Sequence, residues 1–228
     1  IASGITAGED STPDQALEIL TKYNIKLPKK VREKLAEKST TLSTHDKRLS
    51  NVKNKIISAP SQSLKATVKA AKKLGYNTVL IGDLIEGEAK IEAIRQADMA
   101  IKIQAGLKVD DKPVILISGG ECTVSVSGTG KGGPNAEFAL SAAIHMNGKS
   151  GIHLIACDTD GIDGFGNAAG AIVGPKTLQN ATDIGLNAKE MLMNHDSHTF
   201  FSKIDSQVIS GPTLTNVNDF RAFLIQRE

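Results

Sequence analysis

Alternating stretches of apolar and polar residues predict an ordered succession of helices and short strands. In the first half, apolar residues recur at helical spacing in several segments, and two shorter apolar runs are typical of strands. In chain order the predicted elements are a helix over residues 11–24, a helix from residue 28, a strand over residues 52–59, a helix over residues 60–74, a strand over residues 78–81 and a helix over residues 86–103. Strands alternating with helices indicate an α/β fold, with a parallel sheet and helical crossovers.

The second half follows a polar, turn-rich segment at residues 106–113, so we place a domain boundary between residues 107 and 108. The elements predicted after it are a strand over residues 114–117, a turn at Ser118, Gly119 and Gly120, a strand over residues 121–127, a glycine-rich loop over residues 128–133, a helix over residues 134–148, a strand over residues 152–157, helices over residues 175–184 and 188–193, and a strand over residues 220–225.

The glycine-rich loop is the first candidate for chemistry. Gly128, Gly130, Gly132 and Gly133 allow the backbone to approach a ligand closely, and Pro134 suits the first position of the helix that follows. A strand, such a loop and a helix N-terminus together favour a phosphate-binding site. The alternative is a mobile hairpin loop, which the glycine content alone does not exclude.

The same loop matches the dinucleotide fingerprint as Gly128-x-Gly130-x-x-Gly133, with Asp158 at a suitable distance downstream for a ribose-binding acid. However, residues 122–127 alternate between polar and apolar, whereas the fingerprint strand lies at the centre of a parallel sheet and is apolar on both faces. The match is therefore weak support for an NAD(P)-dependent enzyme.

An acidic cluster directly follows the strand predicted over residues 152–157. Asp158, Asp160 and Asp163 suit a hard cation such as Mg²⁺, or one base beside metal-holding partners. The alternative is an acidic turn whose side chains cap their own backbone. His195 and His198 are further acid–base candidates, although we interpret them as caps or surface groups.

Composition excludes several classes of protein. The net charge of +2 and the scarcity of aromatic residues, 4% of the chain, argue against a nucleic-acid partner. No apolar run has transmembrane length, and no signal peptide is visible, so we expect a cytoplasmic protein without a membrane partner. Cys122 and Cys157 fall in predicted strands, and we interpret them as buried thiols in a reducing compartment.

Several motifs, taken together in their order and spacing, resemble the MOFRL-type glycerate 2-kinases, a family whose members also carry the name hydroxypyruvate reductase. The motifs are S-G-G-E at residues 118–121, G-K-G-G-P-N-A-E-F-A-L at residues 130–140, T-D-G-I-D-G at residues 159–164, A-A-G-A at residues 168–171 and T-L-T-N-V-N-D at residues 213–219. The opening I-A-S-G-I-T at residues 1–6 is similar to a turn of the same family.

The resemblance implies two α/β domains with the active site in the cleft between them, and ATP-dependent phosphorylation of D-glycerate at its 2-hydroxyl group with Mg²⁺. Residues 1–107 would then be the end of a Rossmann-like parallel-sheet first domain, and residues 108–228 a second, MOFRL-like α/β domain. The implied catalytic residues are Asp160, Asp163 and Lys131, with metal held by Asp160 and Asp163. The implied cofactor-binding residues are Gly119, Gly120, Glu121, Gly130, Gly132, Gly133, Asn135, Thr159 and Asn216.

Two departures from the family pattern concern this site. Pro134 stands where many relatives have an arginine, and Asn167 stands where relatives often have an aspartate. The chain also opens with Ile1-Ala2-Ser3-Gly4, which we interpret as the end of a strand and its turn. We therefore expect a requirement for an N-terminal segment, in cis or as a second chain, and leave self-association into a homo-oligomer open. The alternatives are an NAD(P)-dependent hydroxypyruvate reductase and a non-catalytic nucleotide-binding fragment.

Overall fold

The computed structural model describes residues 6–37 and 41–227, which divide into two compact units with the boundary in the chain between residues 57 and 58. The first unit is helical and begins with a capping box, because Thr12 Oγ1 accepts from Gln15 N at 3.2 Å and Gln15 Oε1 accepts from Thr12 N at 2.8 Å. Its elements are α1 (Pro13–Lys22), α2 (Lys29–Ala36) and the 3₁₀ turn η1 (Lys47–Leu49). The turn expected at Ile1 to Gly4 lies outside the described residues.

The strand predicted over residues 52–59 is wrong. This segment has no regular structure, and the side chains of Ile56 and Ile57 are 78% and 84% exposed. A strand needs a neighbour for its N–H and C=O groups, and the strands of the second unit pair only with one another.

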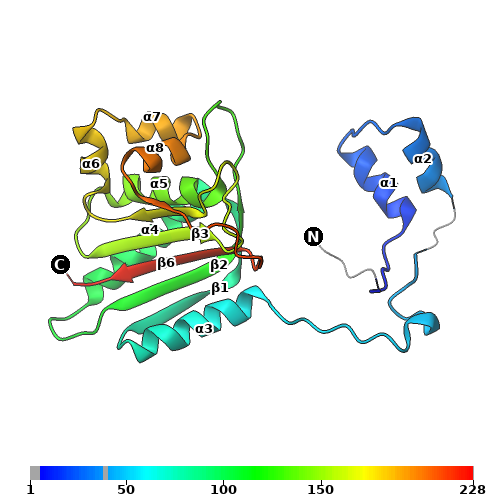
Figure 1. The fold of residues 1–228 in the computed structure, drawn as a ribbon, viewed down its shortest axis with the longest axis horizontal. Helices are drawn as coiled ribbons and strands as arrows, with labels where there is room; N and C mark the ends of the chain where they lie inside the picture. Colours follow the sequence, from blue (N-terminus) through cyan, green and yellow to red (C-terminus); the bar gives the residue numbers. More distant parts are fainter. Residues whose placement is uncertain (1–5, 38–40, 228) are drawn as a thin grey trace. The chain divides into compact units, whose positions relative to one another are not determined.

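The second unit is built on one six-stranded sheet with the order β1-β2-β6-β3-β4-β5. Only β1 and β2 are parallel, and every other pair of neighbours is antiparallel, so the sheet is mixed within the predicted α/β class, which is confirmed. Figure 1 shows β6, in red, between β2 and β3. The strands are β1 (Asn77–Glu88), β2 (Val114–Thr123), β3 (Ile152–Asp158), β4 (Gly170–Val173), β5 (Gln207–Val208) and β6 (Asp219–Ile225).

Helices cover the two faces of this sheet unequally. Ser118 of β2 donates to Gln96 of α4 (Ala89–Gly106), whereas a Cβ on the next residue, Gly119, would lie 3.2 Å from Leu64 of α3 (Pro60–Lys73). Successive residues of a strand point to opposite faces, so α3 and α4 lie on opposite sides of the sheet. The helix α5 (Pro134–Met146), most of whose residues are buried, packs beside α4. The main core therefore lies between the sheet and the α4–α5 pair.

Three short helices gather near α5, on the side away from α3 (Figure 1). They are α6 (Thr177–Asp183), α7 (Ala188–Met193) and α8 (Ser197–Lys203). The sequence pattern does not predict α8, whose fully buried Phe200 and Phe201 rings meet edge to face with centroids 5.1 Å apart. These helices place residues 194–197 against the glycine-rich loop.

The turn predicted at Ser118–Gly120 is also wrong, because β2 runs through it without interruption and ends at Thr123. Gly120 has φ +128°, and a Cβ there would lie 2.2 Å from the carbonyl oxygen of Ile85, so this glycine permits close contact between β1 and β2. The predicted strand over residues 121–127 is therefore the end of β2 followed by irregular backbone.

The domain boundary predicted between residues 107 and 108 lies between two paired strands. β1 precedes it and β2 follows it, and the two belong to the same sheet and the same compact unit. The assignment of residues 1–107 to one domain and 108–228 to another thus stays a prediction. Among the described residues, no helix is long and apolar enough to span a membrane.

Candidate functional site

The N-terminus of α5 is capped by a carboxylate from the acidic loop. Asp163, 1% exposed, accepts from the backbone N–H groups of Asn135 at 2.9 Å and Ala136 at 2.8 Å. His198 Nε2 lies 3.4 Å from the same carboxylate and also 2.6 Å from the carbonyl oxygen of Asp163. Burial raises the pKa of the Asp163 carboxyl above its usual value, and the donated hydrogen bonds oppose that shift. Both oxygens of a predicted metal ligand are thus already engaged.

This cap also occupies the place where the sequence predicts a phosphate. Pro134 has no N–H, Asn135 and Ala136 donate to Asp163, and Glu137 donates to the carbonyl of Gly133 at 2.9 Å. The first turn of α5 therefore has no N–H group left for a bound anion. The helix N-terminus is instead stabilised by the negative charge of Asp163.

The glycine-rich loop is held by the segment between α7 and α8. Thr129 N and Gly130 N donate to Asn194, at 3.1 Å to Oδ1 and 3.0 Å to the carbonyl oxygen. Lys131 N donates to Asp196 Oδ1 at 2.8 Å. The loop from residue 124 to residue 133 is thus fixed by backbone hydrogen bonds, although it has no regular secondary structure.

The glycines of this loop permit close backbone packing. A Cβ on Gly133 would lie 2.1 Å from the carbonyl oxygen of Asp163, and one on Gly132 would lie 2.6 Å from Ser197 Oγ. The N–H groups of Gly132 and Gly133 have no hydrogen-bond partner among the described residues. Packing therefore accounts for the glycines themselves, and these two N–H groups are the part of the loop that remains available to a ligand. The roles of Gly130, Gly132 and Gly133 in cofactor binding stay predictions.

The dinucleotide fingerprint does not have its usual structural setting. A fingerprint loop joins a strand directly to a helix, whereas here β2 ends at Thr123 and irregular backbone continues to Gly133. Because Asp163 also caps the helix that would receive the pyrophosphate, the geometry does not favour a dinucleotide at this loop.

The acidic loop meets the segment before β6. Asp160 Oδ2 accepts from Asn216 Nδ2 at 3.2 Å, and Asp160 Oδ1 accepts from Ile162 N at 2.8 Å. Thr159 Oγ1 donates to the carbonyl oxygen of Asn218 at 2.7 Å and accepts from Val217 N at 2.9 Å. The structure thus brings together three predicted site residues, Thr159, Asp160 and Asn216. It leaves the Asp160 carboxylate partly exposed to solvent.

Asp158, at the end of β3, also has a raised pKa. Partial burial raises its pKa to about 6, and the nearby charges of Asp160 and Asp219 act in the same direction. Asp158 Oδ1 accepts from Asp160 N at 3.0 Å. Asp158 is thus partly protonated near neutral pH, which distinguishes it from an ordinary surface carboxylate.

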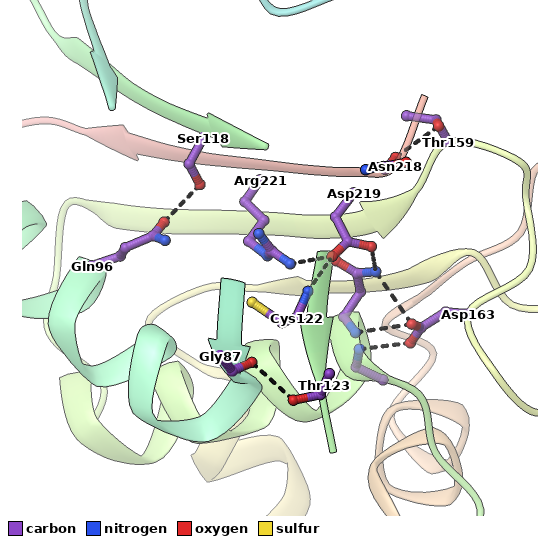
Figure 2. Close-up of polar contacts among 12 residues, drawn as sticks. Gly87, Gln96, Ser118, Cys122, Thr123, Thr159, Asp163, Asn218, Asp219 and Arg221 are labelled. Carbon is purple, nitrogen blue, oxygen red and sulfur yellow. Dashed lines mark hydrogen bonds and ion pairs between the residues drawn. The ribbon is translucent and has the colours of Figure 1, made fainter. Parts of the chain in front are cut away.

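A buried polar network connects α5 to the middle of the sheet (Figure 2). Asn135 Nδ2 donates to Asp219 Oδ1 at 2.6 Å, Cys122 N donates to Asp219 Oδ2 at 3.2 Å, and the Arg221 guanidinium pairs with the same Oδ2. Arg221, fully buried, lies over the ring of Phe138 with 4.9 Å between guanidinium carbon and centroid. Asn135, predicted to bind a cofactor, thus has its amide nitrogen directed at Asp219 and Asp163.

The remaining predicted site residues contribute no side chain to this network, although Gly120 is the strand partner of Asp219. Gly119 and Gly120 are inside β2, and Glu121 is exposed near its end. Lys131 Nζ lies 5.0 Å from the centroid of the Phe165 ring, beside a cavity of about 240 Å³ that is also lined by His198, Lys203 and Gln207. Lys131 and Lys203 thus give this cavity two cationic side chains.

Cys122 is buried, as the sequence predicts, whereas Cys157 is only partly buried. Burial raises the pKa of Cys122 and of Cys157 to about 11, and both are free cysteines. A thiol with so high a pKa is protonated at neutral pH and is a poor nucleophile. Within residues 6–37 and 41–227, no group of three or more His, Cys, Asp and Glu side chains is placed to hold a metal ion.

The two histidines are more deeply buried than the sequence pattern predicts. His195 and His198 are each 4% exposed, so the interpretation as surface groups is wrong. Both approach buried carboxylates, since His195 Nδ1 lies 2.9 Å from Glu137 and His198 lies beside Asp163. The signal available in the sequence is that the two histidines closely precede Phe200 and Phe201, whose rings are fully buried.

Comparison with known proteins assigns this region to a family. Residues 114–219 match the model of the MOFRL family. This part of the chain belongs to that family. The MOFRL segment spans β2 to the start of β6 and contains every predicted catalytic and cofactor-binding residue.

Relatives of the whole chain extend beyond the MOFRL segment. A protein of Agrobacterium vitis, to which a hydroxypyruvate reductase activity is ascribed only provisionally, is 42% identical over 99% of this chain and 58% of its own length. D-glycerate 2-kinase of Thermotoga maritima is 35% identical over 99% of this chain and 52% of its own length. The crystal structure of a glycerate kinase from the same species superposes with a TM-score of 0.81 at 34% identity, covering 96% of this chain and 51% of that one.

The resemblance to MOFRL-type glycerate 2-kinases is therefore confirmed. The chain spans about half the length of the curated relatives it matches.

Proposed function

We propose that this chain forms part of the active site of an ATP-dependent kinase that phosphorylates D-glycerate at its 2-hydroxyl group. The observation that carries the proposal is the TM-score of 0.81 to the Thermotoga maritima glycerate kinase at 34% identity over nearly the whole chain. A shared fold alone would be weak support for a shared reaction. Here the similarity includes the glycine-rich and acidic loops of the MOFRL segment, where the candidate site lies.

Phosphoryl transfer depends mainly on positioning and on charge stabilisation, and the two loops offer groups for both. Lys131 supplies a cation at the mouth of a cavity, and Gly132 and Gly133 present N–H groups without partners in the described part of the chain. Thr159 and Asn216 fix the shape of the acidic loop. We propose that phosphate groups bind at the glycine-rich loop and that the glycerate hydroxyl is oriented by the acidic loop.

The acidic loop fits Mg²⁺ through Asp160 better than through Asp163. Kinase sites often hold Mg²⁺ with one or two carboxylates together with the phosphates of the substrate. The Asp160 carboxylate is partly exposed and its oxygens have one donor each, whereas Asp163 is buried beneath α5. Mg²⁺ would supply positive charge against the phosphate oxygens. We propose that Asp160 holds the metal and that Asp163 positions both loops.

The test measures two activities on the 228-residue chain, alone and mixed with the part of the Thermotoga maritima D-glycerate 2-kinase that the chain does not match. We expect ADP formation that requires D-glycerate, ATP and Mg²⁺ together, and no oxidation of NADH or NADPH by hydroxypyruvate. Cofactor oxidation without ADP formation would contradict the kinase proposal and indicate a reductase. Finding neither activity in either arrangement would leave the kinase proposal without support.

The residue-level part of the proposal is tested with Asp160→Asn. We expect turnover to fall by about 10²-fold or more, because the carboxylate charge near the phosphates is lost. Asp110→Asn is the matched control. Asp110 is exposed in a loop that precedes the MOFRL segment, so it belongs to neither the glycine-rich loop nor the acidic loop. Equal turnover in the two variants would show that the Asp160 charge has no part in the reaction.

A further inference from the structure

The side chains of a serine, a histidine and a glutamate form a hydrogen-bonded chain beside the glycine-rich loop. Ser127 Oγ is 3.2 Å from His195 Nε2, and His195 Nδ1 is 2.9 Å from Glu137 Oε2. The three residues come from the loop after β2, the first turn of α5 and the segment between α7 and α8. The proposed kinase reaction uses none of them.

The hydrogen bonds determine where the protons are. A carboxylate can only accept, so the proton between His195 and Glu137 belongs to Nδ1 of the histidine. In the neutral ring Nε2 is then an acceptor, and the Ser127 hydroxyl donates to it. This is the proton arrangement in which a histidine removes a proton from a serine nucleophile while an acid fixes the ring.

Two features of this arrangement are energetically unfavourable for the folded state. Glu137 is 1% exposed and its Oε1 has no partner among the described residues, so a buried acceptor is left unsatisfied. His195 has φ +56°, a left-handed conformation that residues with a side chain seldom adopt. Strained backbone and incompletely satisfied polar groups are concentrated at functional sites.

A small cavity adjoins His195. It measures about 240 Å³ and is lined by the backbone of Gly132 and Gly133 and by the apolar side chains of Val124 and Val126. The N–H groups of these two glycines have no partners in the described chain and are available as the kind of donors that an oxyanion needs. Because the volume is below the usual range for drug-sized ligands, the cavity suits a short acyl group.

We propose that Ser127, His195 and Glu137 form a second catalytic centre, which transfers acyl groups from short-chain carboxylic esters. Ser127 Oγ bonds to the ester carbonyl carbon while His195 Nε2 takes the hydroxyl proton, and the same proton passes to the departing alcohol as the ester C–O bond breaks. Water then adds to the acyl-serine with His195 again accepting a proton, which returns to Ser127 as the carboxylic acid leaves. Glu137 is a positioning residue. This activity needs no step of the proposed kinase reaction, although it uses the same Gly132 and Gly133 N–H groups that are proposed to bind phosphate.

The test uses a fluorophosphonate probe on the 228-residue chain, with the modified residue located by mass spectrometry. Ser127 Oγ forms a bond to phosphorus, fluoride leaves, and His195 takes the proton. We expect labelling at Ser127 and hydrolysis of p-nitrophenyl acetate, both lost in Ser127→Ala and reduced about 10²–10⁴-fold in His195→Gln. Ser127 is exposed, so we expect Ser127→Ala to melt as the parent chain does.

Ser125→Ala is the matched control, because Ser125 is an exposed serine on the same segment whose hydroxyl bonds to Glu88 instead of a histidine. It should be labelled as fast as the parent chain. Glu137→Gln should shift the pH dependence of labelling, because an amide can donate to Nδ1 and leave the proton on Nε2; a role in folding alone would change the melting temperature but not this profile. Labelling absent from the folded parent chain, or equal in Ser127→Ala, would overturn the proposal.

Discussion

Asp163 shows how one side chain joins two parts of the candidate site. Its two carboxylate oxygens accept from N–H groups in the first turn of α5, which have no acceptor within the helix. Its backbone carbonyl accepts from His198. The same residue therefore fixes the acidic loop, α5 and α8 with respect to one another. Its conformation follows from burial and from donors that lie far away in the sequence.

We expect Asp163→Ala to lower the free energy of unfolding by about 2–4 kcal/mol, because it removes a helix cap and leaves two buried N–H groups without acceptors. Urea unfolding at pH 7 measures this loss. Asp160→Ala is the comparison, and since Asp160 is partly exposed we expect a loss of at most about 1 kcal/mol. Equal losses for the two variants would contradict the structural role of Asp163.

Asp158 should make stability depend on pH. Its pKa rises from 3.8 to about 6 in the folded protein, so folding favours the protonated form. That contribution is complete below about pH 4 and is lost as the pH rises through 6. We expect Asp158→Asn to be more stable than the parent chain at pH 8 by about 1 kcal/mol, a modest figure because water screens a half-buried carboxylate, and equally stable at pH 4. A variant less stable at pH 8 in urea unfolding would be evidence against this assignment.

At the scale of elements, α5 and the glycine-rich loop before it form the centre of the site. Helix α5 begins directly after Gly133, whose backbone lies close to that of Asp163. The loop is hydrogen-bonded to the segment between α7 and α8. Glycine is required here by the space between two backbones.

We expect Gly133→Ala to lower the free energy of unfolding by about 1–3 kcal/mol, because the added Cβ would lie 2.1 Å from a backbone carbonyl oxygen that cannot move without displacing Asp163. Gly106→Ala is the control. A Cβ at Gly106, in the last turn of α4, meets nothing within 4 Å, so alanine should be neutral or slightly stabilising there. Thermal melts of both variants check this difference, and a Gly133→Ala protein as stable as the parent would refute it.

The elements differ in how well their sequences predict them. Helices α1, α3, α4 and α5 and strands β3 and β6 were predicted close to their bounds, because their apolar periodicity and proline starts are local signals. The run at residues 52–59 was misassigned because pairing depends on a neighbour that the local pattern does not reveal. Helix α8 and the contacts of His195 and His198 were missed for the same reason, since their burial depends on α5 and the acidic loop.

At the scale of the molecule, the sheet and its helices belong to one compact unit of residues 58–228. The main core is made entirely by residues from Ala89 onward, and α3 adds the buried Leu64 and Ala71. This unit should contain the information for its own fold.

We therefore expect residues 58–228 to fold alone, with a cooperative melt and a circular dichroism spectrum typical of mixed helix and strand. A shorter fragment, residues 77–228, lacks α3 and uncovers the face of the sheet that contacts Leu64. It should melt at a lower temperature or associate through that apolar surface. A fragment 58–228 without a cooperative melt would show that the unit is not autonomous.

The position of β6 has a consequence for synthesis on the ribosome. β6 is translated after the other five strands, yet it lies between β2 and β3 and provides the only link between the two halves of the sheet. Until it emerges, the nascent chain holds β1 and β2 as one separate pair and the strands from β3 to β5 as another, each with an open edge. We therefore expect the sheet to close late, through pairings distant in sequence, and the unfinished chain to bind chaperones that shield exposed strands.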